Sequence, residues 1–153
     1  MTPQEPLKIR LLDREAKLPT RATDGSAGLD LYSTATVAVP PASVVGDKVS
    51  IGRALISTGI CAAIPKGYVG KIGSRSGLSI EKNIEVGAGW IDSDYRGEIK
   101  IELKNLGSEP FLVRPGMRVA QLFILQALHV NIEHVDDLPS SERGERGFGS
   151  SGG

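Results

Sequence analysis

The segment Glu98-Ile99-Lys100-Ile101-Glu102-Leu103-Lys104 alternates charged and apolar residues without a break. Successive side chains of a β-strand point to opposite faces, so this pattern predicts a strand with one face in water and one in the core. Shorter stretches of the same period recur along the chain. We therefore expect further strands at residues 7–11, 29–32, 36–39, 54–64, 68–72, 111–113, 119–125 and 130–135.

Turn-forming residues separate these expected strands. The sequences Pro40-Pro41, Pro65-Lys66-Gly67, Asn105-Leu106-Gly107 and Arg114-Pro115-Gly116 are typical of turns. The 19 Gly and 9 Pro residues would interrupt long helices, so we expect only one short helix, around residues 76–82. Many short strands at regular spacing predict an all-β fold, either a sandwich or a barrel.

Length and composition limit the kind of protein. The 153 residues suit one domain, which we place at residues 1–142, followed by a glycine-rich C-terminal arm at residues 143–153. The 18 basic and 18 acidic residues balance, which argues against binding to long nucleic acid. No apolar run reaches the ~20 residues of a membrane span. The N-terminal residues lack a signal pattern, so we expect a cytoplasmic or nuclear protein with no membrane partner.

The segment Ser74-Arg75-Ser76-Gly77-Leu78 has the residue types of a phosphate-binding site. It follows an expected strand and begins the expected helix. Free backbone N–H groups, a hydroxyl and a guanidinium can converge on an anion at such a point. An Arg-Ser-Gly sequence is also a common turn, and the segment alone does not decide between the two interpretations.

The segment Gly87-Ala88-Gly89-Trp90-Ile91-Asp92-Ser93-Asp94-Tyr95-Arg96-Gly97 combines glycines with two carboxylates. Glycine lets a ligand approach the backbone closely. Asp92 and Asp94 would share one face of an extended strand. One carboxylate could then act as a general base while the other makes a structural or metal contact. The alternative is a β-hairpin in which both Asp residues cap the turn.

The C-terminal segment Arg143-Gly144-Glu145-Arg146-Gly147-Phe148-Gly149 carries charges and an aromatic ring in a sequence that cannot form a core. One interpretation is a disordered end. The other is a mobile arm that orders over a ligand, with Arg for phosphate and Phe for stacking. A glycine-rich dinucleotide loop is excluded, because no strand closely precedes the segment and no helix can follow it.

Together these segments resemble the trimeric dUTPase family. Five motifs occur in family order, namely Ala27-Gly28-Leu29-Asp30-Leu31, Arg75-Ser76-Gly77-Leu78, residues 87–97, Pro115-Gly116-Met117-Arg118-Val119-Ala120-Gln121-Leu122, and residues 143–152. They are spread over nearly the whole chain. The resemblance implies an all-β jelly roll (a distorted β-barrel) and a homotrimer with three active sites at its subunit interfaces.

The resemblance also implies a reaction, a substrate and a cofactor. Asp92 is expected to be the general base that deprotonates a water for attack on the α-phosphorus of dUTP, which gives dUMP and diphosphate. Mg²⁺ is expected on the three phosphates, where a hard divalent ion neutralises charge on the leaving oxygens. Asp30 is expected to meet this ion through water. Such a reaction keeps uracil out of DNA and supplies dUMP for dTMP synthesis.

The other residues that the resemblance implies bind the substrate. Ser76 and Gly77 are expected to contact the phosphate chain and Arg143 the γ-phosphate. Arg75 is expected to support the Ser76–Gly77 loop, with Gln121 in the same polar network. Main-chain groups near Gly87, Gly89 and Lys100 are expected to read uracil in a hairpin formed by the third motif. Tyr95 is expected to pack under the deoxyribose, while the arm closes with Phe148 on uracil, followed by Gly149 and Ser150.

Four features depart from the family pattern. Ser74 stands where many members have Pro, which is expected to loosen the entry to the loop. Trp90 replaces a smaller apolar residue and is expected either in the trimer interior or beside the pocket. Arg146 replaces a Gly and is expected to point outward. Residues 45–53 form a longer connection than usual, which we interpret as a surface hairpin.

Two rival functions remain open on the same fold. A dCTP deaminase-like enzyme would need an acidic residue beside the cytosine amino group, and Ala88 and Gly89 provide none. A non-catalytic, nucleotide-sensing trimer would not require Asp92 or the Arg and Phe of the arm. Hydrolysis of dUTP is therefore the expected function.

Overall fold

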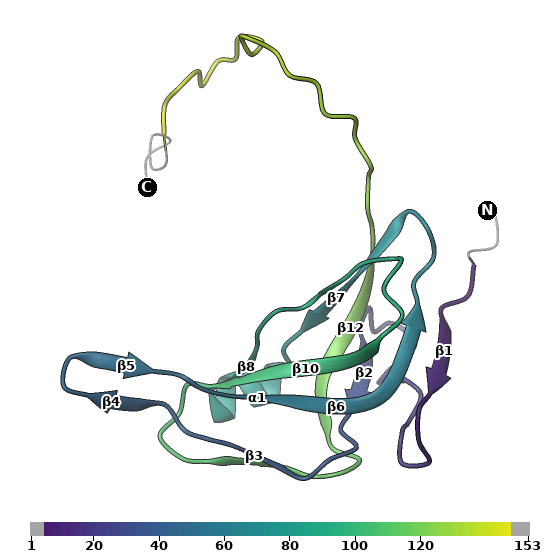
Figure 1. The fold of residues 1–153 in the computed structure, drawn as a ribbon, viewed down its shortest axis with the longest axis vertical. Helices are drawn as coiled ribbons and strands as arrows, with labels where there is room; N and C mark the ends of the chain where they lie inside the picture. The colour runs from purple at the N-terminus through teal and green to yellow at the C-terminus, as the bar shows by residue number, and fades with distance from the viewer. Residues whose placement is uncertain (1–4, 148–153) are drawn as a thin grey trace.

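The computed structural model describes residues 5–147 and consists mainly of antiparallel strands (Figure 1). Two four-stranded sheets, with strand orders β1-β6-β10-β8 and β2-β12-β7-β9, form the body. Two smaller pairs, β11-β3 and β4-β5, complete the described part of the fold. The expected all-β jelly roll is confirmed. The elements are β1 (Lys8–Leu11), β2 (Leu29–Tyr32), β3 (Val37–Val39), β4 (Ser43–Val45), β5 (Lys48–Ser50), β6 (Gly52–Ala63), β7 (Tyr68–Gly73), α1 (Ser76–Lys82), β8 (Ile84–Val86), β9 (Trp90–Ile91), β10 (Glu98–Asn105), β11 (Phe111–Val113) and β12 (Arg118–Gln126).

The core lies between the two larger sheets and follows the predicted alternation. On β10, Ile99, Ile101 and Leu103 are fully buried, whereas the charged residues between them are exposed or half-buried. The apolar residues of β2 and β12 complete the core from the other sheet, since Leu31 and Leu122 are also fully buried. The second sheet therefore turns its other face outward, and the residues on that face are free for function.

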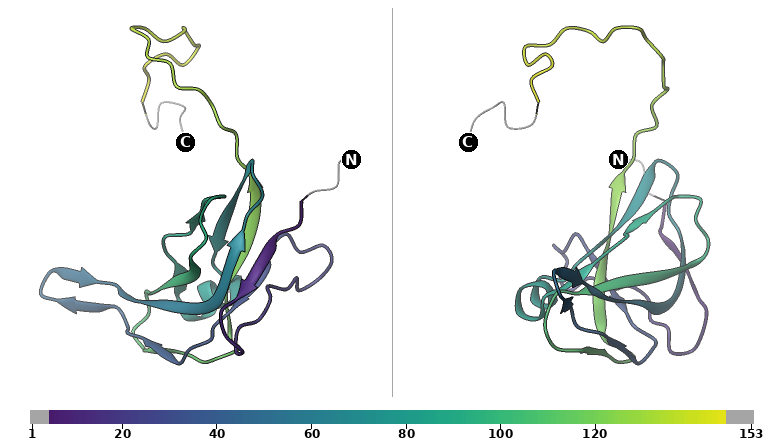
Figure 2. Two further views of the ribbon diagram at one scale, coloured as in Figure 1. Left: turned by 45° about the vertical axis from the view of Figure 1, so that its right-hand side comes forward. Right: turned by 60° about the vertical axis from the view of Figure 1, so that its left-hand side comes forward.

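The short helix and the surface hairpin are both found near where the sequence predicts them. Helix α1 begins after Arg75, which is extended at φ −85° and ψ 130°, and ends at Asn83 in the left-handed region at φ 56°. Strands β4 and β5 form a hairpin that projects from the body, with Gly46 at φ 65° in its turn (Figures 1 and 2). This hairpin covers most of the predicted 45–53 segment.

The expected strand at residues 130–135 is wrong. This segment continues from β12 but runs away from the body (Figure 1), and the side chains of Val130 and Ile132 are 78% and 98% exposed. A strand needs a neighbouring backbone to pair with, and within residues 5–147 this segment pairs with none. Strands β8 and β9, of three and two residues, were not expected. In the described part of the chain, no helix has the length and apolar character needed to cross a membrane.

Candidate active site

The Asp30 carboxylate forms one end of the candidate site. It lies on β2, directly opposite Gln121 of β12, and is 6% exposed. Its Oδ1 lies 3.4 Å from Arg75 Nε, and its Oδ2 lies 3.4 Å from Arg118 Nη1. Gln121 Nε2 donates to the backbone carbonyl of Ser74, at 3.4 Å. The structure thus brings three of the predicted residues, Asp30, Arg75 and Gln121, into one cluster.

Ser74 fixes the entry to the loop and does not loosen it, contrary to expectation. Its hydroxyl donates to Glu85 Oε2 at 2.6 Å and accepts from the Val86 amide at 2.9 Å. The Ser79 hydroxyl donates to the other Glu85 oxygen. The hydrogen bonds from Ser74 and Ser79 lower the pKa of Glu85 below its usual 4.5, although burial acts in the opposite direction. Glu85 therefore connects Ser74, before the Arg75–Ser76 loop, and Ser79, in α1, to β8.

Ser76 and Gly77 lie at the exposed start of α1. Among residues 5–147, no side chain caps the first turn of this helix, and a Cβ placed on Gly77 would meet no atom within 4 Å. The first backbone N–H groups of a helix lack partners within the helix. An anion can therefore approach the backbone at Ser76 and Gly77 without steric hindrance.

Asp92 forms the opposite end of the candidate site. It is exposed and lines a pocket of about 170 Å³. Tyr95 closes one side of this pocket, and its hydroxyl donates to the Glu98 carbonyl at 2.9 Å. The Lys100 ammonium lies 3.8 Å from the Glu98 carboxylate. The pocket is lined by Trp90, Ile91, Asp92, Tyr95, Glu98 and Lys100, three of which are predicted site residues.

The third motif lies between two paired strands, but it is not a simple hairpin. Strands β8 and β10 run antiparallel and frame it, whereas β9 leaves this sheet and pairs with β7. The expected hairpin is therefore corrected to a wide loop whose centre joins the other sheet. Gly89 is favoured by close packing, because a Cβ there would lie 2.9 Å from the Ile72 carbonyl oxygen; a Cβ on Gly87 would meet only the movable ends of the Glu102 and Lys104 side chains.

One chain does not bring the two ends of the site together. Asp92 follows Ile91, whose partner Gly70 lies near the start of β7, whereas Arg75 follows the end of β7 at Gly73. At ~3.3 Å per residue, the two ends are roughly 15–20 Å apart. We call them the Asp30 half-site (Asp30, Arg75, Ser76, Gly77 and Gln121) and the Asp92 half-site (Gly87, Gly89, Asp92, Tyr95 and Lys100).

The C-terminal arm contacts neither half-site in the described residues. After β12 the chain runs away from both sheets (Figures 1 and 2). Arg143 Nε donates to the Arg146 carbonyl at 3.0 Å, and Arg143 Nη2 donates to the Gly147 carbonyl at 2.8 Å. Arg146 is exposed and folds onto the same turn, where its side chain donates to the carbonyls of Glu142 and Arg143. The predicted residues Phe148, Gly149 and Ser150 lie outside the described residues.

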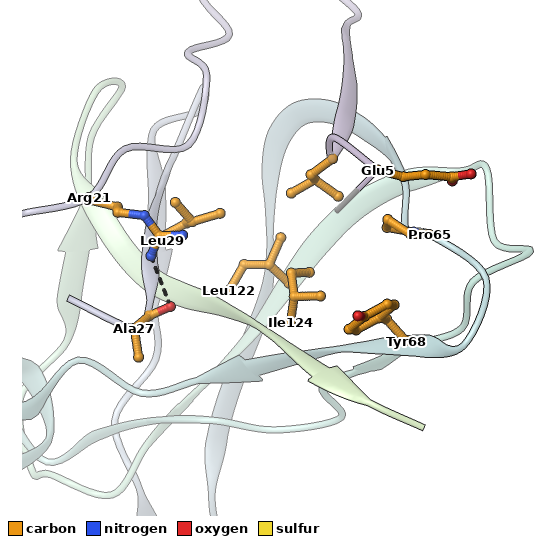
Figure 3. Close-up of a pocket in the computed structure, with 9 residues that line it drawn as sticks. Glu5, Arg21, Ala27, Leu29, Pro65, Tyr68, Leu122 and Ile124 are labelled. Carbon is orange, nitrogen blue, oxygen red and sulfur yellow. Dashed lines mark hydrogen bonds between the residues drawn. The ribbon is translucent and has the colours of Figure 1, made fainter. Parts of the chain in front are cut away.

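A second concavity, of about 260 Å³, opens between β1, β2, β7 and β12 (Figure 3). Apolar side chains such as Leu29, Leu122 and Ile124 line it, and Arg21 at its edge donates to the Ala27 carbonyl at 3.3 Å. None of the predicted site residues that fall within residues 5–147 lines it. The sequence interpretation also missed Arg118 and Glu85 as supporting residues. Arg118 lies inside the fourth motif, but an ion pair that spans 88 positions carries no local sequence signal.

Fold and site together define an all-β jelly-roll protein with a divided site, basic at one end and acidic at the other. The sequence model of the dUTPase family matches residues 14–152. Deoxyuridine 5'-triphosphate nucleotidohydrolases from Dictyoglomus turgidum and swinepox virus are 46% and 43% identical to this chain. The alignments cover 94% and 95% of this chain, and 96% of each relative. The chain belongs to the dUTPase family of enzymes.

Solved structures agree with this assignment. The dUTPase of Staphylococcus bacteriophage 80alpha with dUpNHpp superimposes with a TM-score of 0.82 at 32% identity, over 97% of this chain and 99% of the phage chain. A mutant dUTPase of phage phi11 of S. aureus superimposes with a TM-score of 0.76 at 27% identity, over 87% of this chain and 98% of that chain. The phi11 protein coordinates a structural Mg(II) ion.

Proposed function

We propose that this chain hydrolyses dUTP to dUMP and diphosphate, with Asp92 as the general base. A water molecule gives a proton to the Asp92 carboxylate, its oxygen attacks the α-phosphorus, and the bond to the diphosphate oxygen breaks. The observation that carries the proposal is the exposed Asp92 in a pocket with Tyr95 and Lys100, separated along β7 from a cluster that suits phosphates. A placed general base contributes roughly 10²–10⁴-fold to the rate.

The active unit is a homotrimer in which the Asp92 half-site of one subunit meets the Asp30 half-site of the next. Two features support this arrangement. The half-sites are too far apart to act on one nucleotide within a chain. Residues 128–132 also expose the large apolar side chains Leu128, Val130 and Ile132, which a neighbouring subunit would cover.

The phosphates bind at the Asp30 half-site. The open backbone at Ser76 and Gly77 accepts the phosphate oxygens, and Arg75 and Gln121 complete this surface. Arg143 of the C-terminal arm reaches the γ-phosphate when the arm, residues 143–153, closes. Phe148 then stacks on uracil, which contributes roughly 1–3 kcal/mol, and Gly149 and Ser150 follow it over the nucleotide. Closure of the arm excludes bulk water from the reacting atoms.

The base and sugar bind at the Asp92 half-site. Main-chain groups near Gly87, Gly89 and Lys100 pair with the uracil edge, and cytosine is rejected because its reversed donor and acceptor order would leave buried groups unpaired. The Tyr95 ring packs under the deoxyribose, where it leaves no space for a 2′-hydroxyl. Tyr95 is well held for this purpose by its hydrogen bond to the Glu98 carbonyl.

Mg²⁺ fits this site as an ion carried by the triphosphate. Within residues 5–147 no three His, Cys, Asp or Glu side chains gather to hold a metal, and both Asp30 oxygens already face arginines. Mg²⁺ keeps several waters and commonly binds through substrate phosphates with one or two carboxylates. Asp30 would then meet the ion through water. When bound, the ion neutralises charge on the departing diphosphate.

The test compares Asp92→Asn with Asp94→Asn, which removes the same charge two residues away. Diphosphate and ammonia release are followed with Mg²⁺ and each nucleoside triphosphate. We expect diphosphate from dUTP alone, a loss of at least ~10²-fold in kcat for Asp92→Asn with retained dUTP binding, and near-normal kcat for Asp94→Asn. Ammonia from dCTP would indicate the deaminase-like rival. Binding of dUTP without turnover by the wild-type protein would indicate the sensing trimer.

A further inference from the structure

Lys71 and Trp90 form an unusual pair beside the Asp92 pocket. Trp90 is the only tryptophan of the chain, is 62% exposed and lines the pocket together with Asp92. Lys71 lies directly opposite it on β7, and its Nζ is 4.8 Å from the centre of the indole ring. A cation over the face of Trp is attracted by the negative ring face. One face of the ring therefore holds a positive charge in place.

This pair lies on the sheet face that carries Asp30 and Gln121 of the Asp30 half-site. Directly opposed residues of antiparallel strands, and residues two apart on one strand, share a face. Lys71 is opposed to Phe123, which is two residues from Gln121, and Gln121 is opposed to Asp30. Lys71 therefore shares a face with Trp90 at one end and with the Asp30 half-site at the other.

The Lys71 charge is not neutralised by the protein. Among the ion pairs formed within residues 5–147, none includes Lys71. Gly89 makes room for this side chain, because a Cβ at that position would lie only 3.2 Å from Lys71 Nζ. An oriented ammonium without an ion-pair partner, on the face that also carries the Asp30 half-site, suits a polyanion, since charge-assisted bonds to phosphate are strong.

We propose that Lys71 binds the triphosphate of dUTP, and that Trp90 is the positioning residue that holds Lys71 in place. This inference rests on the proposed function, because it takes dUTP as the ligand and a subunit interface as the site. It assigns Trp90 a place beside the pocket. It also gives Gly89 a second role, as the position that admits the Lys71 side chain.

The test measures kcat and KM for dUTP with the full-length protein and Mg²⁺. We expect Lys71→Met to raise KM roughly tenfold or more, as for a lost hydrogen bond to a charged group, with a much smaller change in kcat. Lys66→Met removes the same charge from the turn before β7 and serves as the matched control, with KM unchanged. Lys71→Arg should restore most of the affinity, because it keeps a cation over the ring.

The positioning role is tested by a double-mutant cycle. We expect Trp90→Val to raise KM, and the Lys71→Met/Trp90→Val double variant to be no worse than Lys71→Met alone. Trp90→Phe, which keeps an aromatic face, should stay close to the wild type. Additive effects of the two substitutions on KM, or a wild-type KM in Lys71→Met, would overturn the proposal.

Tryptophan fluorescence separates this inference from the proposed function. Trp90 is the only tryptophan, so binding of the non-hydrolysable analogue dUpNHpp should change the tryptophan fluorescence to a saturating value. The Lys71→Met variant should need a higher analogue concentration to reach it. If the wild-type protein binds the analogue but does not hydrolyse dUTP, the proposed function fails. The Lys71 assignment is then still supported by weaker analogue binding in Lys71→Met and contradicted by unchanged binding. If dUTP is hydrolysed and the titration is the same in Lys71→Met, only the Lys71 assignment fails.

Discussion

The Asp30 carboxylate lies 3.4 Å from Arg75 Nε, and this ion pair joins β2 to the loop that begins α1. The second carboxylate oxygen faces Arg118 on β12 at the same distance. Asp30 is almost fully buried, whereas both arginines are partly exposed. The carboxylate therefore orients two cations whose outer atoms remain available to an anion.

Asp30→Asn should lower both stability and substrate affinity. The substitution leaves two arginines without their counter-charge, and a disrupted polar contact of this kind costs about 1–3 kcal/mol in the free energy of unfolding. Arg75 would also lose its orientation, so we expect a higher KM for dUTP. Urea unfolding and steady-state kinetics measure the two effects. Asp24→Asn, in an exposed turn, is the matched control; equal behaviour of the two variants would contradict this role for Asp30.

Stability should depend on pH through Glu85. Hydrogen bonds from Ser74 and Ser79 lower its folded-state pKa below the usual 4.5. The unfolded chain therefore takes up the proton at higher pH than the native protein, so the contribution is present above pH 4.5 and is lost as the pH falls through the folded-state pKa.

Ser79→Ala should reduce this contribution, because it removes one of the two bonds that lower the Glu85 pKa. We expect the variant to be less stable than the wild type at pH 7, and the difference to shrink at pH values well below 4.5. Urea unfolding at several pH values measures the difference. Ser43→Ala, on an exposed strand, is the control. A stability difference that did not change with pH would show that Glu85 ionisation is not involved.

Most strands that pair within the chain could be predicted from the sequence, whereas β8 and β9 were missed and residues 130–135 were wrongly expected to form a strand. The alternation in β10 is set by burial of Ile99, Ile101 and Leu103. Residues 130–132 also alternate between apolar and polar residues, yet Val130 and Ile132 remain exposed. Periodicity reports which face of a segment is apolar; it does not report whether the covering surface belongs to the same chain.

The candidate site shows the same limit. The residue types around Arg75 and Asp92 were compatible with phosphate and base chemistry, and the resemblance to the dUTPase family implied those roles. The separation of Arg75 and Asp92 along β7 depends on the pairing of β9 with β7. With only two residues, β9 is too short to show an alternating pattern in the sequence. Similarly, the role of Ser74 depends on Glu85, which is eleven positions away and reaches it only through the fold.

Gly97→Ala should weaken the discrimination between dUTP and UTP. A Cβ at this position would lie 2.5 Å from the Tyr95 hydroxyl and 2.7 Å from its ring, so the ring must move. If Tyr95 excludes the 2′-hydroxyl, its displacement should lower the ratio of kcat/KM for dUTP to that for UTP. Gly25→Ala, where the added Cβ meets nothing within 4 Å, is the control. An unchanged ratio in Gly97→Ala would assign sugar selection elsewhere.

Deletion of residues 143–153 should abolish efficient hydrolysis and leave the fold intact. In the described part of the arm, the Arg143 side chain bonds only to the carbonyls of Arg146 and Gly147, so the sheets lose no contact with it. Loss of the Phe148 stack alone corresponds to roughly 1–3 kcal/mol of binding. Thermal unfolding and dUTP hydrolysis measure the two properties, and a lost thermal transition would contradict the independence of the arm.

Single substitutions in the arm should then separate its two cations. Arg143→Ala should raise KM for dUTP more than it weakens binding of dUDP, because only dUTP carries the γ-phosphate that Arg143 is proposed to bind. Arg146 is not proposed to contact a phosphate, so Arg146→Ala should change the dUTP KM far less. Equal losses for both nucleotides in Arg143→Ala would mean that this side chain only shapes the turn of the arm, since a lost γ-phosphate contact cannot affect dUDP.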